Sequence, residues 1–168
     1  MIVGSPGSGK STMSKKLSEM LGIEVVHLDK LFWNPGWVES EKADFDRRLS
    51  EALEKDSWIA DGNYSRTIPL RLERADTVIL LNFPRIVCVF RALKRSAFGY
   101  GRVRSDMGEG CPERFDFEFL KYVWNFRKRN FQKVKSLVEQ AEVENYIEIK
   151  SNADLKRFYD DIKTGKYR

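Results

Sequence analysis

The chain of 168 residues is long enough for one domain with a sizeable buried core, and we expect residues 1–168 to form a single domain. Its 42% hydrophobic and 33% charged residues are typical of a soluble globular protein. No apolar run approaches the length of a membrane span and no secretory n-region precedes the first strand, so we expect a cytoplasmic monomer or weak dimer without a membrane partner.

The chain opens with a P-loop, the turn that holds nucleotide phosphates. Residues 4–11 (GSPGSGKS) have a Gly, four free positions and then Gly-Lys-Ser. Glycines let successive backbone N–H groups turn inward around a phosphate, Lys10 is expected to reach the β- and γ-phosphates, and the Ser11 hydroxyl is expected to bind Mg²⁺. An apolar strand over 1–3 and a helix over 11–21 agree with the motif, so an empty glycine-rich turn is disfavoured. The residues expected to bind the nucleotide here are Gly4, Ser5, Pro6, Gly7, Ser8, Gly9, Lys10, Ser11 and Thr12.

The second predicted strand, residues 24–28, ends at Asp29. Ligands of open α/β sheets bind beyond the carboxyl ends of the strands, so Asp29 is a candidate for a substrate hydroxyl or a magnesium-bound water. The equally weighted alternative is that Asp29 is a helix N-cap or a solvated loop residue. His27 is the one histidine and cannot by itself build a zinc site or a catalytic dyad, so we expect it in or near the core.

Aromatic residues gather in the next segment, 31–38 (LFWNPGWV), which its Pro-Gly pair predicts to be irregular. Trp33 and Trp37 either cover a substrate base or pack the loop onto the core, and packing is the more frequent outcome. A helix over 39–55 follows.

The third predicted strand, residues 57–61, ends at Asp61, the place of a Walker B carboxylate that holds Mg²⁺ directly or through water. The next residue is Gly62, whereas motor ATPases have a glutamate that activates water, so the sequence favours phosphoryl transfer over hydrolysis. Arg66 is either a ligand of a substrate phosphate or a surface arginine. The candidate substrate-binding residues are Asp29, Trp33, Trp37, Asp61 and Arg66.

A helix over 67–74 leads to the fourth strand, residues 76–83, whose nearly continuous apolar run is typical of a central parallel strand. The next helix begins at Pro84. Its predicted apolar stripe consists of Ile86, Phe90, Leu93 and Ala97. Arg91 and Arg95 lie four residues apart on another face, where they either grip phosphates or face solvent.

The segment 98–112 (FGYGRVRSDMGEGCP) contains the glycines and arginines that a mobile lid of a P-loop protein would contain. Arg102 and Arg104 are expected to reach the transferred phosphate when the lid closes and excludes water. The segment contains one cysteine, Cys111, so a zinc-stapled lid is excluded. We expect Cys111 and Cys88 to be free thiols.

A long helix is predicted over 113–141. Its apolar stripe consists of Phe117, Leu120, Trp124, Phe131, Val134 and Val138. Arg127 falls on this stripe and should have an anionic partner, either a nucleotide phosphate or a carboxylate such as Asp61, because an unpaired buried charge is costly. A last strand over 145–150 and a helix over 152–163 complete the chain.

These motifs resemble the P-loop nucleotide and small-molecule kinases built like adenylate kinase and, more closely, the DNA topology modulation protein family. The likeness is carried by GSPGSGKS from Gly4, HLDKLFWNPGW from His27, WIADGNYS from Trp58, NFPR from Asn82, GRVRSDMGEGC from Gly101 and RFDFEFLKYVWNF from Arg114. The resemblance implies an α/β, three-layer P-loop NTPase fold with a five-stranded parallel sheet in the order 2-3-1-4-5. It also implies a short lid at about residues 98–114.

The resemblance further implies ATP as the phosphoryl donor, with Mg²⁺. By position, Arg91 matches an arginine that binds the nucleotide. The positions that match catalytic residues are Lys10, Arg95, Arg102, Arg104 and Arg127. The chain has Asn63 and Tyr64 after Asp61-Gly62, where adenylate kinases have Phe-Pro-Arg, so the identity of the small acceptor stays open.

Charge is concentrated in residues 84–135, which contain 13 Lys and Arg against 5 Asp and Glu, a net +8 within a total of +5. Such a block serves either nucleotide phosphates or a nucleic acid backbone. Helix-turn-helix, zinc-finger and RNP signatures are absent from the sequence, as is the Asn-Lys-x-Asp segment of GTPases. We therefore favour an ATP-dependent kinase of a nucleotide or other small acceptor, with a nucleotide-dependent DNA-binding regulator as the alternative.

Overall fold

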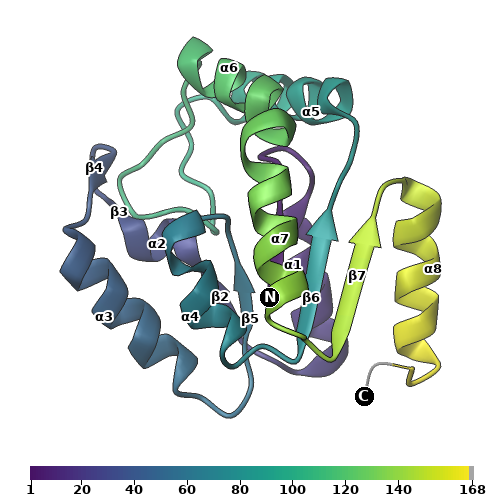
Figure 1. The fold of residues 1–168 in the computed structure, drawn as a ribbon. Coiled ribbons are helices and arrows are strands. Elements are labelled where there is room, and N and C mark those ends of the chain that lie inside the picture. Colours follow the sequence, from purple (N-terminus) through teal and green to yellow (C-terminus); the bar gives the residue numbers. More distant parts are fainter. Residues whose placement is uncertain (167–168) are drawn as a thin grey trace.

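Five short apolar segments form the central sheet of the computed structural model, which describes residues 1–166 (Figure 1). All neighbouring strands in it run parallel. The strands are β1 (Ile2–Gly4), β2 (Val25–His27), β5 (Ile59–Asp61), β6 (Thr77–Leu81) and β7 (Asn145–Ile149). Their spatial order, β2-β5-β1-β6-β7, is the order 2-3-1-4-5 of these strands along the chain. The expected three-layer P-loop fold is confirmed.

Alternate residues of the strands point to opposite faces, and helices cover both faces (Figure 1). In β6, Val78 and Leu80 are buried in one core cluster, and Ile79 and Leu81 in another. The first cluster is closed by α3 (Lys42–Leu53), α4 (Ile68–Leu72) and α7 (Gln132–Gln140). The second is closed by α1 (Lys10–Leu21), α5 (Arg85–Gly99) and α8 (Asn152–Lys163). Burial on both faces explains why β6 is apolar at consecutive positions.

A short helix and a hairpin replace the irregular segment expected over 31–38. They are α2 (Leu28–Phe32), β3 (Trp33–Asn34) and β4 (Val38–Glu39), the last two paired antiparallel. Gly36 and Trp37 form the turn with positive φ angles of 79° and 64°. The Trp33 ring meets the rings of Phe32 and Trp37 edge to face, at centroid distances of 5.0 and 5.5 Å. The hairpin is therefore held by aromatic packing.

The buried face of α5 differs from the predicted stripe. Ile86 and Phe90 are 68% and 66% exposed. The residues buried instead are small and four apart: Cys88, Ala92 and Ser96. They let α5 approach the P-loop so closely that a Cβ on Gly7 would collide with the backbone carbonyl oxygen of Cys88. Contact with the P-loop, and not the most apolar stripe, decides how α5 is rotated.

A π-helical turn interrupts the long helix predicted over 113–141. In order, the segments are α6 (Phe117–Phe126), η2 (Arg127–Phe131) and α7. A π turn takes up one extra residue, so the buried face before it moves by one position relative to the face after it. Val123 and Phe126 are buried there, whereas Phe117 and Trp124 are exposed. The expectation that Arg127 lies on a buried stripe is wrong, because its side chain is exposed.

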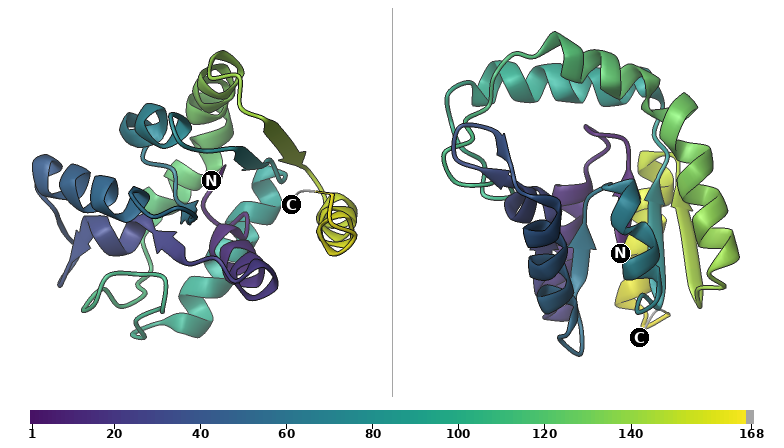
Figure 2. Two further views of the ribbon diagram at one scale, coloured as in Figure 1. Left: turned by 90° about the horizontal axis from the view of Figure 1, so that it is seen from below. Right: turned by 60° about the vertical axis from the view of Figure 1, so that its left-hand side comes forward.

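The carboxyl ends of the strands lie below α5 and α6, which cross above the P-loop (Figure 2). Residues 100–116, here called the lid segment, are irregular and pass from α5 to the β3–β4 hairpin before α6 begins. A 3₁₀ turn, η1 (Ser65–Thr67), follows β5 on the same edge. Within residues 1–166, no helix is long and apolar enough to cross a membrane.

Candidate functional site

The P-loop joins β1 to α1 as a compact turn. The Ser8 N–H donates to the Ser5 carbonyl oxygen at 3.0 Å, and Gly7 and Gly9 have positive φ angles of 77° and 100°. These angles are available to glycine without the strain that a Cβ would cause. Of the residues predicted to bind the nucleotide, Ser5 and Ser8 are buried and the rest of the loop through Thr12 largely lines one cavity.

Two polar groups of the P-loop stand where a phosphate would need them. The Lys10 ammonium donates to the carbonyl oxygens of Gly4 and Ser5 at 3.0 and 3.2 Å, and burial lowers the pKa of Lys10. Ser8 Oγ is buried and lacks a hydrogen-bond partner among the described residues. An unpartnered buried hydroxyl is costly unless a ligand satisfies it, so the loop is suited to an anion.

Helix α5 turns two arginines toward the P-loop. Arg91 Nη1 donates to the Ser8 carbonyl oxygen at 3.2 Å, and its Cζ lies 4.7 Å from the centroid of the Phe83 ring. Arg95 is one turn further along, and burial lowers the pKa of its guanidinium. Both side chains are half-buried and line the cavity in front of the P-loop. The helix therefore presents two cations at the phosphate-binding edge.

A buried lid carboxylate holds Arg95 and Arg104 together. Glu113 is 6% exposed, and its Oε1 lies 3.1 Å from Arg95 Nε and 2.6 Å from Arg104 Nε. These are ion-pair distances, yet neither Nε meets hydrogen-bond geometry with any described residue. One carboxylate therefore holds the two guanidinium groups side by side through its charge.

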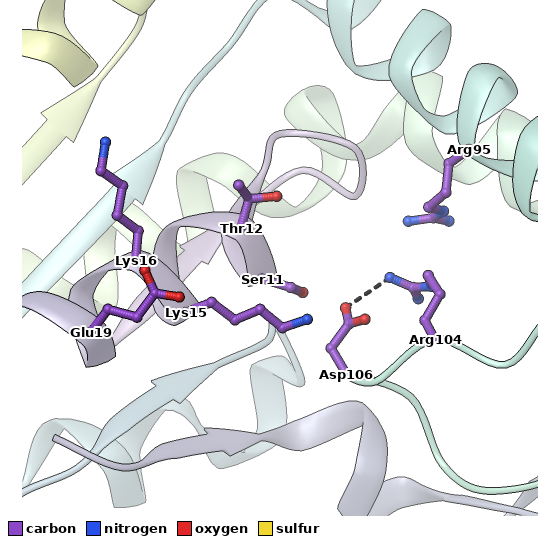
Figure 3. Close-up of a pocket in the computed structure, with 8 residues that line it drawn as sticks. All are labelled: Ser11, Thr12, Lys15, Lys16, Glu19, Arg95, Arg104 and Asp106. Atoms are coloured by element: carbon purple, nitrogen blue, oxygen red, sulfur yellow. Dashed lines mark hydrogen bonds and ion pairs between the residues drawn. The ribbon is translucent and has the colours of Figure 1, made fainter. Parts of the chain in front are cut away.

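A cavity of about 500 Å³ separates α1 from the lid segment (Figure 3). It is lined by Ser11, Thr12, Lys15, Lys16, Glu19, Arg95, Arg104 and Asp106. Arg104 Nη1 donates to Asp106 at 2.8 Å. Burial alone would raise the pKa of Asp106, but the hydrogen bond with Ser11 and the charge of Arg104 outweigh it and lower the pKa. Lys15 also donates to the Ser105 hydroxyl, so the lid is tied to α1 at two points.

Asp61, at the end of β5, is buried and held by two side chains. Its Oδ2 accepts from the Ser14 hydroxyl at 2.6 Å and lies 2.8 Å from His27 Nδ1. β2 and β5 are neighbours, and their register sets His27 opposite Asp61. The histidine lies near the core as expected, with a side chain 9% exposed, but its acidic partner follows only from the strand order.

The loop after Asp61 is braced from within. Asn63 Oδ1 accepts from the Gly4 N–H at 3.1 Å, which ties this loop to the start of the P-loop. Arg71 is fully buried and donates to three backbone carbonyl oxygens of the same region, the shortest being that of Asn63 at 2.6 Å. Burial lowers the pKa of Arg71 to about 10. Arg71 therefore has a structural role beside the site.

A larger cavity of about 960 Å³ opens in front of the P-loop, a size typical of small-molecule sites. Part of its lining, here called the aromatic half, consists of Asp29, Phe32, Trp33, Trp37, Tyr64 and Tyr122. The Tyr64 hydroxyl donates to Asp29 Oδ1 at 2.6 Å. Burial raises the pKa of Asp29, and the hydrogen bond from Tyr64 opposes this shift. Asp29, Trp33, Trp37 and Asp61 thus line the same cavity, and their binding of a substrate stays a prediction.

The lid segment is docked on the β3–β4 hairpin. Trp37 Nε1 donates to the Pro112 carbonyl oxygen at 3.0 Å. Gly108 lies so close to the hairpin that a Cβ there would collide with the backbone carbonyl oxygen of Trp33. Both tryptophans therefore pack the lid and line the cavity.

We expect Gly108→Ala to lower the free energy of unfolding by about 1–3 kcal/mol, because the added methyl group forces the lid and hairpin backbones apart. Urea unfolding measures this change. Gly99→Ala is the matched control, since its Cβ would meet Glu113 Cγ at an ordinary 3.4 Å. If Gly108→Ala unfolds at the same urea concentration as the parent, the lid is not docked on the hairpin in solution.

Three predicted site arginines lie elsewhere. Arg66 is exposed and donates to both carboxylate oxygens of Asp46 on α3, at 2.6 and 2.8 Å. Arg102 is exposed on the lid segment, where its carbonyl oxygen accepts from the Glu113 N–H at 2.9 Å. Neither side chain lines either cavity, and the same holds for Arg127. The Asp46 carboxylate on α3 binds Arg66 outside the site. The π turn at η2 places Arg127 on the exposed side of its helix.

Several site residues were not singled out from the sequence. They are Ser14, Asn63, Tyr64, Asp106 and Glu113. For Asp106 and Glu113 a signal was present, since acidic residues inside an arginine-rich segment indicate charge compensation.

The side chains present fit a magnesium nucleotide. Ser11, Asp61 and Asp106 offer oxygen donors, which Mg²⁺ prefers. Within residues 1–166, no group of three or more His, Cys, Asp or Glu side chains could hold a metal by itself. Mg²⁺ in kinases is bound by one or two carboxylates together with substrate phosphates, so this donor set suits a metal that arrives with the nucleotide.

Comparison with known proteins is in accord with this geometry. A family model described as an AAA domain matches residues 1–98. A putative adenylate kinase of Sulfurisphaera tokodaii is 30% identical over 153 residues, covering 83% of this chain and 78% of that protein. A putative adenylate kinase of Thermococcus onnurineus is 34% identical over 109 residues, and the match spans 60% of this chain and 56% of that relative. Shikimate kinase from Acinetobacter baumannii, solved with shikimate, shares the fold with a TM-score of 0.55 at 17% identity, covering 99% of this chain and 94% of that one.

Proposed function

The chain belongs to the AAA-domain family and to the adenylate kinase-like P-loop kinases, and on this premise we propose that it is an ATP-dependent phosphotransferase. It moves the γ-phosphate of ATP to a nucleotide or another small acceptor. The observation that carries the proposal is the convergence of Arg95 and Arg104 beside Lys10 and the P-loop, with Glu113 between them. Phosphoryl transfer depends mostly on such positioning and charge stabilisation.

Each part of the site has a task in this reaction. Lys10 and the P-loop N–H groups hold the β- and γ-phosphates, and Arg91 adds a cation beside Ser8. Arg95 and Arg104 stabilise the charge on the transferring group, while the docked lid segment excludes water. Mg²⁺, held with Ser11 and Asp61, would neutralise the phosphate oxygens when bound.

Transfer of label tests the proposal. With γ-labelled ATP and Mg²⁺, we expect labelled product and stoichiometric ADP in the presence of an acceptor from a panel of nucleotides and metabolites. Removal of Mg²⁺ with EDTA should abolish the product. Intact ATP in every reaction, with ATP demonstrably bound, would contradict the phosphotransferase function.

We propose further that, among these kinases, the chain belongs to the DNA topology modulation protein family. Arg91, Arg95 and Arg104 belong to the basic block 84–135 and turn toward the P-loop, which favours nucleotide phosphates over a DNA backbone as the partner of these charges. Duplex affinity that falls steeply with salt would instead support the DNA-binding alternative.

A further inference from the structure

We propose that the phosphoryl acceptor is a hydroxyl compound without a phosphate of its own, bound in the aromatic half of the larger cavity with Asp29 accepting the proton of the attacking hydroxyl. This inference rests on the phosphotransferase function proposed above and specifies its second substrate. It is carried by the distribution of charged groups around the cavity.

Three arginines of α3, η1 and α4 do not line the cavity and are engaged by other groups. Arg66 is bound bidentately by Asp46, and Arg48 pairs with Asp44 and donates to a backbone carbonyl. Arg71 is buried under the loop after β5 with all its hydrogen bonds directed to backbone oxygens. A phosphate needs cationic donors to replace its hydration, and these three side chains do not supply them.

A fourth arginine, Arg114, lines the cavity beside Trp37. Arg114 Cζ stands 5.2 Å from the centroid of the Trp37 ring, and Arg114 Nη2 lies 3.7 Å from Asp116. Its side chain is 57% exposed, so it covers the tryptophan from the solvent side. The other cations that line the cavity belong to the P-loop, α5 and the lid segment: Lys10, Arg91, Arg95 and Arg104. With Arg114 engaged by Trp37 and Asp116, the aromatic half suits an acceptor without a phosphate.

Asp29 is the carboxylate of the aromatic half. It is the second residue of α2, the helix that follows β2 directly. Asp29 lines the same cavity as Lys10, Asp61 and Arg104, the groups that handle the γ-phosphate in the proposed reaction. The nearby phenol groups are those of Tyr64, which donates to Oδ1, and Tyr122 of α6. A carboxylate has about four lone-pair sites, so Asp29 can accept a further hydrogen bond from a hydroxyl.

This placement fits proton removal in the transfer step. The acceptor oxygen forms a bond to the γ-phosphorus, the bond from that phosphorus to the β,γ-bridging oxygen breaks, and ADP leaves with the electron pair. The acceptor O–H releases its proton to the Asp29 carboxylate. An ionised phosphate acceptor carries no proton on the attacking oxygen and needs no such base. Burial, which raises the pKa of Asp29, makes the carboxylate a stronger base.

Asp29→Asn tests the proposal with water as a hydroxyl acceptor that is always present. We expect the full-length variant to bind ATP as tightly as the parent but to hydrolyse it about 10²-fold more slowly or worse, in line with the loss of a general base. Hydrolysis by the parent should fall at acidic pH as Asp29 takes up a proton, and this dependence should vanish in Asp29→Asn. Asp56→Asn, at an exposed position after α3, is the matched control and should keep the parental rate and pH profile.

The second arm uses defined acceptors and distinguishes the two classes. AMP, CMP and UMP should yield no diphosphate from γ-labelled ATP. Formation of a nucleoside diphosphate, or an Asp29→Asn variant that hydrolyses ATP at the parental rate, overturns the hydroxyl-acceptor proposal and leaves the phosphotransferase function standing. A parent protein that binds ATP but neither hydrolyses nor transfers it overturns the phosphotransferase function itself.

A stability measurement guards against misfolding of Asp29→Asn. Burial raises the pKa of Asp29 in the folded protein, so the folded protein becomes less stable as the pH rises and this carboxyl ionises. At pH 8 the Asp29→Asn variant, which has no charge there, should therefore melt at or above the parental temperature. The advantage should shrink as the pH falls and the parental Asp29 takes up a proton. A variant that melts well below the parent at pH 8 would contradict the burial of Asp29 on which its role as base depends.

Discussion

Replacing Lys10 with Met is expected to reduce phosphoryl transfer by about 10²–10³-fold and to weaken ATP binding, because it removes the one P-loop ammonium from the β- and γ-phosphates. Steady-state kinetics and ATP titration measure both effects. Transfer and ATP affinity that both match the parent would contradict the role of this lysine.

The stability of Lys10→Met separates this effect from unfolding. Burial lowers the pKa of Lys10, so the charged ammonium destabilises the fold at pH 7, and that penalty is relieved as the pH rises through the lowered pKa. Met has a similar length and no charge, so the variant should melt at or above the parental temperature near pH 7. Lys42→Met, an exposed position at the start of α3, is the matched control and should change neither activity nor melting.

Replacing Arg104 with Met is expected to lower kcat by about 10³-fold with a much smaller change in ATP affinity, because this guanidinium acts on the charge of the transferring group. Arg104 is joined to Glu113 and Asp106, and it lines both cavities. The ratio of the kcat loss to the affinity loss is the measurement. A loss confined to ATP affinity would assign Arg104 to ground-state binding instead.

Arg102 supplies the comparison within the same segment. It lies two residues away with the same charge, yet its side chain is exposed and outside both cavities. Arg102→Met should therefore lower kcat far less than Arg104→Met does. Equal losses of kcat in the two variants would mean that the total positive charge of the lid segment matters. The ion pair of Arg104 with Glu113 would then give Arg104 no special role.

The sequence predicted the strands well because the evidence for them is local. The apolar run of β6 and the short apolar segments ending at Asp29 and Asp61 each report burial within a few residues. The P-loop was equally visible, since its chemistry requires consecutive residues. Strand order came from the family resemblance, and the structure confirms it.

Helix faces were predicted less well, and the physical reasons differ. In α5, close approach to the P-loop selects small residues for the buried side and leaves Phe90 exposed. In the α6–α7 segment, the π turn at η2 shifts the phase, so a stripe counted at a uniform 100° per residue put Arg127 on the wrong side. Neither effect leaves a periodic trace in the sequence.

By itself, the sequence determined the P-loop, the carboxylates that follow two strands and the arginine-rich segment after the fourth strand, because each depends on residues close together in the chain. The tertiary structure alone decided which of those side chains meet. Parallel register brings His27 to Asp61, and folding of the lid brings Glu113 to Arg95 and Arg104. Such pairs depend on the packing of segments far apart in the chain, and a pattern within one segment carries no information about them.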